Sequence, residues 1–297
     1  MTERLVKCPL CKSGHFLNYH EVKDFAVSKE IFLLTKCSEC QLIFTNPRPS
    51  AENIGPYYDF PEYYSHQTHA KSLTHWIYNR VKKKNLADKL ALLSSLTQER
   101  TLLDYGCGAG DLIHLAQQKG WKVTGIEPNI GARTIANQKS KNRVKESIHE
   151  LKKNKEYSII TLFHVLEHIH ELRKTVKKLV THLKPNGYLI FAVPNPESWD
   201  AKKYGDHWAG WDVPRHLYHF NQEAMKQFQY IFDLNLLDQK PMKFDSYYVS
   251  LLSEGYKANN ATLVKKYLNA ILSGYQSNKQ AKRQNNYSSN IYIFQKK

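Results

Sequence analysis

Four of the five cysteines lie in two pairs with C-x-x-C spacing, a pattern typical of metal-binding turns. Each short turn brings two sulfurs to one side of an ion, and two such turns complete a tetrahedron. A site made of four thiolates leaves no position for a catalytic water, so the spacing predicts a structural Zn²⁺ ion. Disulfide bonds are the alternative, and they are less favoured in a chain with no recognisable export signal. The predicted ligands are Cys8, Cys11, Cys37 and Cys40.

The second group that could do chemistry is a glycine-rich turn, which follows an apolar segment ending at Asp104. Glycines stand at positions 106, 108 and 110, and an amphipathic helical pattern follows them. A second apolar segment, 121–126, ends at Glu127. Glycines let a ligand approach the backbone, and a carboxylate at the next strand end can accept hydrogen bonds from ribose hydroxyls. The pattern therefore predicts a β-α-β unit that binds a nucleoside.

The glycine spacing is D-x-G-x-G-x-G, which differs from the G-x-G-x-x-G of dinucleotide sites, because Asp111 or Ile113 would replace the third glycine. Asp104 would also repel a pyrophosphate. S-adenosylmethionine carries an ammonium and a sulfonium and has no phosphate. The residues therefore favour S-adenosylmethionine as the cofactor.

At these residues, and over about residues 80–295, the sequence resembles the class I S-adenosylmethionine-dependent methyltransferases. The segment His164-Val-Leu-Glu-His168 after an apolar run is similar to a signature of that family, and so is 183–187, where Asn186 replaces a glycine. The family's acidic residue at the start of the fourth strand is absent. The resemblance implies an α/β fold with a Rossmann-like, mostly parallel seven-stranded sheet, preceded here by a small zinc-ribbon-like module.

The resemblance also implies how the cofactor would be held. Asp104 and the glycine turn would contact the methionine moiety, Glu127 the ribose, and Pro128 the adenine. Phe163 and His164 would lie near the transferable methyl group. The full predicted cofactor-binding set is Asp104, Tyr105, Gly106, Cys107, Gly108, Gly110, Glu127, Pro128, Phe163 and His164.

Candidate bases for removing a proton from the acceptor are histidines after the fourth strand and in the loop at about 194–222. The alternative is that His168 caps backbone groups and that His164 serves only through its backbone. Related quinone-biosynthesis methyltransferases use a similar carboxylate–histidine segment for a divalent ion, a role that Glu167 and His168 could share. The candidate bases are His164, His168, His207 and His216.

The loop at 194–222 is dense in aromatic residues and predicts an acceptor pocket. Trp208 and Trp211 could stack on a ring, and Arg215 could bind a phosphate or carboxylate. In the alternative interpretation the tryptophans pack an insertion against the sheet, and Arg215 pairs with an acid.

These residues need elements to position them. We predict a zinc-ribbon-like module at 1–46, a linker with capping helices at 47–98 that includes a helix at 73–96, and the methyltransferase domain at 99–297. Two short strands should lie between the cysteine pairs. Near the end we expect a strand-like run from 244, a helix at 262–275, a mobile loop at 279–286 and a late antiparallel strand at 290–294.

The chain has 297 residues, with 43 Lys and Arg against 27 Asp and Glu, a formal net charge of +16. Such a balance favours anionic partners, namely phosphorylated small molecules, nucleic acid or anionic membrane surface. An apolar run of membrane-spanning length and a secretory signal are both absent, so we expect a cytoplasmic protein without integral membrane association.

Together these features predict a methyltransferase that acts on an anionic small-molecule acceptor, such as a nucleotide sugar or a glycan or cell-surface precursor. An RNA methyltransferase that uses the zinc module and basic surface to bind RNA is the first alternative. A non-catalytic scaffold that binds S-adenosylmethionine is the second. The intact Asp104, glycines and Glu127 argue against the scaffold.

Overall fold

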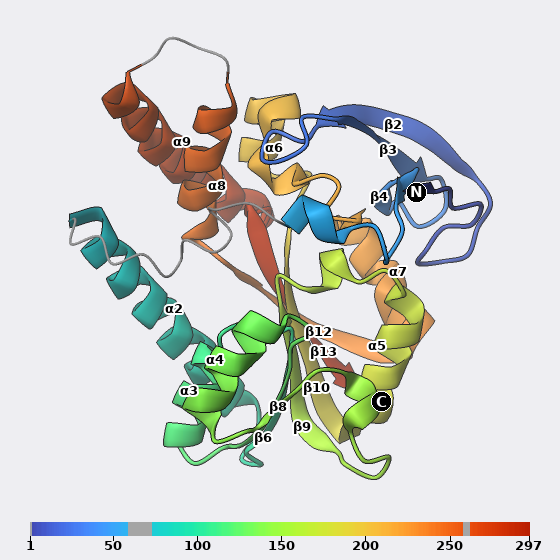
Figure 1. Cartoon of the computed structure of the whole chain (residues 1–297). Coiled ribbons are helices and arrows are strands. Elements are labelled where there is room, and N and C mark those ends of the chain that lie inside the picture. The colour runs from blue at the N-terminus through green and yellow to red at the C-terminus, as the bar shows by residue number, and fades with distance from the viewer. Residues whose placement is uncertain (1, 59–72, 258–261) are drawn as a thin grey trace.

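The computed structural model describes residues 2–58, 73–257 and 262–297, and its centre is a seven-stranded sheet (Figure 1). The strand order is β12-β13-β10-β9-β6-β7-β8. Only β13 runs antiparallel to its neighbours, β10 and β12, which confirms the predicted mostly parallel sheet and its late antiparallel strand. The strands are β6 (Thr101–Tyr105), β7 (Lys122–Ile126), β8 (Val144–Lys145), β9 (Tyr157–Phe163), β10 (Leu183–Pro194), β12 (Leu234–Pro241) and β13 (Ser289–Lys296).

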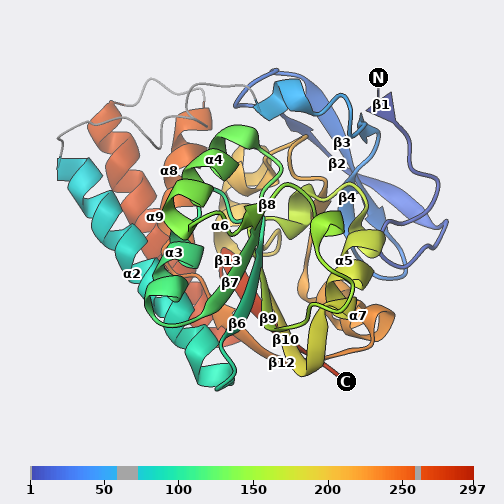
Figure 2. The ribbon, with the colours of Figure 1, turned by 60° about the horizontal axis from the view of Figure 1, so that its bottom comes forward.

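Helices cover both faces of this sheet (Figure 2). Successive residues of a strand point to opposite faces, so Ile159 and Ile160 of β9 belong to different hydrophobic clusters. One face packs against α2 (Leu73–Leu96), α3 (Asp111–Gln118) and α4 (Ile130–Ser140). The other packs against α5 (Leu172–Thr181) and α7 (Gln222–Phe232).

Helix α2 has the predicted bounds. Leu90 and Leu93 are buried against the sheet, as their helical spacing requires. Asp111 at the start of α3 pairs with Lys82 of α2 and Lys139 of α4, each at 2.6 Å, so three helices meet beside the glycine turn. In the predicted linker and capping region 47–98, residues 59–72 lie outside the described part of the chain.

The amino-terminal strands form a second sheet that includes a strand from much later in the chain. Its order is β11-β4-β3-β2, and Tyr218 of β11 pairs with Phe44 of β4. The first 46 residues therefore share a sheet with the loop at 194–222. The strands are β2 (Phe16–Lys23), β3 (Ile31–Cys37), β4 (Ile43–Thr45) and β11 (Tyr218–His219), and β1 (Thr2–Glu3) pairs with β5 (Arg48–Pro49).

Short helical turns shape the edge of the sheet where the strands' carboxyl ends lie. They are η1 (Gly55–Tyr58), η3 (Ile148–Glu150), η4 (Leu166–His168), α6 (Trp199–Tyr204), η5 (Gly205–His207) and η6 (Ala209–Trp211).

The strand expected from residue 244 is wrong, because this segment forms the helix α8 (Asp245–Tyr256). Tyrosines and a valine favour a strand locally, but Ser246, Ser250 and Ser253 are buried at helical spacing. Ser246 donates a hydrogen bond to the Gly274 carbonyl of α9 at 3.1 Å, so the two helices approach closely. A Cβ at Gly274 would lie 2.5 Å from a ring carbon of Tyr247, so glycine is required there.

The mobile loop expected at 279–286 is also wrong. Helix α9 (Leu263–Gln284) continues through most of it and ends where Asn285 adopts a left-handed conformation. Ala281 is buried and anchors this last turn despite the polar residues around it. No helix in the described ranges has the length and apolar character needed to cross a membrane.

Candidate functional site

The glycine turn joins β6 to α3, and all three of its glycines have left-handed φ angles. A Cβ at Gly106 would lie 2.4 Å from a methyl carbon of Val165, and one at Gly110 would lie 2.8 Å from Cβ of Ala136. These two glycines are therefore required for packing. Gly108 has a φ of +53° but faces open space, so its lack of a side chain leaves room for a ligand.

Glu127 lies at the end of β7, across the turn from Gly108. One carboxylate oxygen accepts a hydrogen bond from the Gly108 backbone N–H at 2.9 Å, and the other accepts one from Asn129 N–H at 2.9 Å. Pro128 beside it is exposed. The predicted ribose-binding carboxylate therefore lies directly beside the open part of the turn.

Two other residues of the predicted cofactor-binding set, Tyr105 and Cys107, pack against neighbouring parts of the protein. Tyr105 is partly buried at the end of β6, against the larger hydrophobic cluster. Cys107 packs against β7, since a Cβ at Gly125 would lie 2.7 Å from its sulfur. Burial raises the pKa of the Cys107 thiol, so it stays protonated at neutral pH.

Asp104 is buried beneath the turn. Burial raises its pKa to about 6, although a hydrogen bond from the Thr161 hydroxyl, at 2.7 Å, and the charge of Lys89 both favour the ionised form. Lys89 comes from α2, and its ammonium lies 4.0 Å from the ring centroid of Phe163. Burial lowers the pKa of Lys89 against the opposing pull of Asp245 and Asp104.

The sequence reasoning missed Lys89, although the sequence contains a signal. It lies three residues after Leu86 and four before Leu93, on the apolar side of a helix. A lysine there must place its charge against other buried groups.

His164 follows β9 with a φ of +57°, an uncommon conformation for a residue with a side chain. Its Nε2 lies 3.1 Å from Asp245 Oδ2, and its Nδ1 lies 3.5 Å from Glu167 Oε1. Burial disfavours the imidazolium, but these two carboxylates outweigh it and raise the pKa of His164 to about 9. His164 is therefore cationic at neutral pH. Asp245 was missed because its segment was expected to be a strand.

Glu167, His168 and His216 form a cluster whose ligand atoms all lie within 4.8 Å of one another. Glu167 is fully buried, and neither of its oxygens has a hydrogen-bond partner in the part of the chain that the structure describes. Nearby histidines hold the pKa of Glu167 below its usual value, although burial alone would raise it. A buried carboxylate in this state can accept a proton or contribute to binding a cation.

Backbone carbonyls fix the tautomers of both histidines in the cluster. His168 Nδ1 lies 3.0 Å from the Arg215 carbonyl, and His216 Nδ1 lies 3.0 Å from the Gly210 carbonyl. Because a carbonyl only accepts a hydrogen bond, Nδ1 of each histidine carries a proton. The Tyr58 hydroxyl also contacts His168 Nδ1, at 2.9 Å.

The remaining predicted acceptor residues are packed side chains. Trp208 is buried and its indole N–H donates to Asp200 at 2.8 Å, while the Trp211 N–H donates to the Gly205 carbonyl at 3.0 Å. His207 stacks on Phe25 with ring centroids 5.0 Å apart, outside the histidine cluster.

Arg215 is buried between two carboxylates. Its guanidinium lies 3.0 Å from Asp24 and 2.8 Å from Asp212. Burial opposes the charge, but these partners raise the pKa of Arg215 further. The structure thus places Arg215 and the two tryptophans as the packing alternative describes, and Asp24 comes from the amino-terminal sheet.

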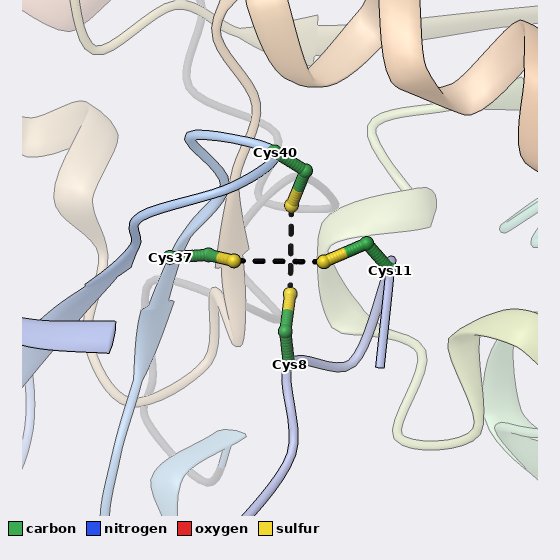
Figure 3. A group of neighbouring side chains, drawn as sticks. All are labelled: Cys8, Cys11, Cys37 and Cys40. Carbon is green, nitrogen blue, oxygen red and sulfur yellow. Dashed lines mark hydrogen bonds between the residues drawn. The ribbon is translucent and has the colours of Figure 1, made fainter. Parts of the chain in front are cut away.

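The four predicted zinc ligands converge on one point (Figure 3). The Sγ atoms of Cys8 and Cys40 lie 3.5 Å apart, as do those of Cys11 and Cys37, and none forms a disulfide. Tetrahedral zinc with Zn–S bonds of about 2.3 Å needs sulfurs roughly 3.8 Å apart. The donor set therefore fits a four-thiolate zinc ion.

The chain is similar to known methyltransferases over part of its length. A family model described as "Methyltransferase domain" matches residues 76–238. A ubiquinone biosynthesis O-methyltransferase of Rickettsia typhi is 30% identical over 123 residues, covering 39% of this chain and 50% of that protein. The chain thus spans about half the length of the curated relatives it matches.

Solved structures with a similar arrangement include the (4+2)-cyclase SpnF, with a TM-score of 0.48 and 17% identity over 71% of this chain and 80% of that one. Another is a SAM-dependent methyltransferase from Archaeoglobus fulgidus, with a TM-score of 0.47 and 14% identity, which covers 76% of this chain and 100% of that one.

Proposed function

Because the chain belongs to the methyltransferase-domain family, we propose that it transfers the methyl group of S-adenosylmethionine to an anionic small-molecule acceptor. The observation that carries this proposal is the open turn at Gly108 between two carboxylates, Asp104 and Glu127. An acidic turn suits a cationic nucleoside and disfavours a pyrophosphate.

We assign the groups around the turn to the parts of this cofactor. Asp104 would attract the ammonium, Lys89 the carboxylate of the methionine moiety, and Glu127 the ribose hydroxyls. When bound, S-adenosylmethionine supplies a methyl group that its sulfonium has already activated. The protein then has to align the acceptor, exclude water and accept a proton.

The proton acceptor is assigned to the Glu167–His168–His216 cluster. Burial and the neighbouring His216 lower the pKa of His168 to about 4, so this imidazole is neutral at pH 7 with its lone pair on Nε2. His164 is less suited to the role of base, because it already carries a proton. Its positive charge would instead hold Glu167 in place. His207 lies beside Phe25 and would act only at the rim of the site.

The net charge of +16 supports an anionic acceptor. The ubiquinone biosynthesis relatives are named as O-methyltransferases, which supports transfer to oxygen. The four-cysteine site would hold a structural Zn²⁺ ion. Through Asp24 and β4, the amino-terminal sheet would then keep Arg215 and the loop at 194–222 in position.

Calorimetry with S-adenosylhomocysteine tests the cofactor assignment. We expect binding by the native chain, and a loss of affinity of about 100-fold or more in Glu127→Ala, because two or three hydrogen bonds are lost at once. Glu146→Ala is the matched control, since Glu146 pairs with Arg133 on the surface. A folded native chain that gives no heat, or a Glu127→Ala variant with unchanged affinity, contradicts the assignment.

Labelled methyl transfer to a panel of nucleotide sugars and to total RNA tests the acceptor class. Label in the small-molecule fraction supports the proposal. Label in RNA, with binding that weakens steeply as salt rises, would replace it with the RNA alternative. Cofactor binding without any transfer would favour the scaffold.

A further inference from the structure

A cavity of about 770 Å³ lies between α2, the segment from β12 to α8, and α9. No residue of the glycine turn lines it, and Lys89 is the residue that it shares with the groups assigned to the cofactor. Figures 1 and 2 show α2 and α9 on the same side of the molecule.

The cavity lining is strongly basic. Six lysines line it against only two aspartates, Asp88 and Asp245, which leaves four positive charges in excess. A lining of this kind concentrates anions, since like charges held close together are stabilised by a counter-charge between them. The lysines are Lys84, Lys89, Lys240, Lys243, Lys279 and Lys282.

Two of these lysines are in ion pairs with neighbouring carboxylates. Lys84 pairs with Asp88, and Lys240 pairs with Asp238. Within residues 2–58, 73–257 and 262–297, no carboxylate forms an ion pair with Lys243, Lys279 or Lys282. Their ammonium groups can therefore bind a ligand without first breaking an ion pair to the described part of the chain.

The rest of the lining suits a flat or apolar body. Tyr247, Tyr275 and Tyr287 contribute rings, and Met242 and Ile291 contribute aliphatic surface. A ligand that fits both parts of the lining has a multiply charged anionic group attached to a ring.

The cavity also reaches the reaction centre. Asp245 lines it and holds His164 Nε2 at 3.1 Å. Lys89 lines it as well, and its ammonium lies over the Phe163 ring. Phe163 ends β9 and His164 follows it, where the methyl group would be delivered. A ligand in this cavity therefore lies beside the proposed position of methyl transfer.

We propose that this cavity binds the phosphate-bearing part of the acceptor, with a diphosphate as its preferred anion. This inference rests on the proposed function. It identifies the acceptor as a phosphorylated small molecule with a ring system, and it gives Lys243, Lys279 and Lys282 the role of selecting it.

Calorimetry with inorganic pyrophosphate at low salt tests the site itself. We expect Lys279→Ala/Lys282→Ala to weaken pyrophosphate binding by about tenfold or more, because two charge-assisted contacts are lost. Lys265→Ala/Lys266→Ala removes the same charge from the same helix outside the cavity, and should change the affinity by less than about twofold. Equal losses in the two variants, or no pyrophosphate binding by the native chain, overturn the proposal.

Binding of S-adenosylhomocysteine is measured on the same samples to separate the two proposals. The Lys279→Ala/Lys282→Ala variant should bind it as the native chain does. If no sample binds it, the proposed function fails, and the pyrophosphate result still decides whether the cavity is an anion site.

A third measurement distinguishes an acceptor from a separate phosphorylated effector. Labelled methyl transfer is followed in a small-molecule cell extract, either untreated or treated with phosphatase. We expect phosphatase to remove the labelled product and pyrophosphate to raise the KM without lowering kcat. Label that survives phosphatase, or pyrophosphate that lowers kcat alone, overturns the acceptor assignment.

Discussion

His164 Nε2 and Asp245 Oδ2 lie 3.1 Å apart and join the end of β9 to the first residue of α8. This contact connects the sheet edge, where methyl transfer is proposed, to the helical pair α8 and α9. Together with Glu167 it opposes the effect of burial on the pKa of His164 and favours the charged imidazolium.

The first prediction concerns the pH dependence of stability. The pKa of His164 is raised from 6.5 to about 9 in the folded chain, so its contribution is fully present below pH 6.5 and is lost as the pH rises through 9. The melting temperature of the native chain should fall over that interval. In Asp245→Asn the fall should be smaller. Melting curves recorded across this pH range test this prediction, with Asp238→Asn as the surface control. A profile in Asp245→Asn that matches the native one would show that the His164–Asp245 pair does not cause the pH dependence.

Cofactor affinity should also depend on pH, through Asp104. Its pKa of about 6 means that it becomes an anion as the pH rises through 6, and an anion attracts the ammonium of the ligand. Affinity for S-adenosylhomocysteine should therefore increase from about pH 5 to about pH 7. Asp104→Asn should bind more weakly at pH 7 and lose most of this dependence. A native profile that is flat over the interval would remove Asp104 from the ligand contact.

The open position at Gly108 provides a test of where the ligand lies. Gly108→Ala should reduce affinity for S-adenosylhomocysteine by about tenfold or more, because the new methyl group occupies the space next to the turn. Gly205 is a matched control, since it also has a positive φ, +55°, and a Cβ there would have nothing within 4 Å. Gly205→Ala also places a side chain at a positive φ, and it should keep native affinity. Equal losses in the two variants would attribute the effect to strain alone.

Removal of the zinc site should destabilise more than the amino-terminal strands. Cys8, Cys37 and Cys40 belong to the same buried cluster as residues of β9 and β10. Cys37→Ser should lower the zinc content from about one ion per chain to near zero and lower the melting temperature of the whole chain. Cys107→Ser leaves the four ligands intact, so metal analysis should find its zinc unchanged. A Cys37→Ser chain with native zinc content would contradict the assignment.

Much of the central sheet was predictable because each strand is an apolar run next to a recognisable motif. Strands β6, β7 and β9, which carry or lead into Asp104, Glu127 and His164, were found in this way. The carboxyl-terminal helices were less predictable. Helix α8 buries its serines against α9 at Ser246 and against η6 at Ser253, and local propensity does not reveal such partners.

The cofactor side of the site was also easier to foresee than the acceptor side. The glycine turn and Glu127 lie within one β-α-β unit, so their spacing in the sequence is enough to predict that they lie close together in the fold. Arg215 instead pairs with Asp24, 191 residues away, and the charge of Lys89, on a separate helix, interacts electrostatically with Asp104 and Asp245. Pairings of this kind follow from the packing of distant elements and leave no spacing pattern in the sequence.

The pairing of β4 with β11 has a consequence for how the chain folds while it is being translated. Residues 43–45 emerge from the ribosome long before Tyr218 and His219, so the edge of β4 stays without its partner while most of the chain is made. An unpaired strand edge readily pairs with another chain. We therefore expect nascent chains that stop before residue 218, and amino-terminal fragments released by proteolysis, to self-associate where the complete chain does not.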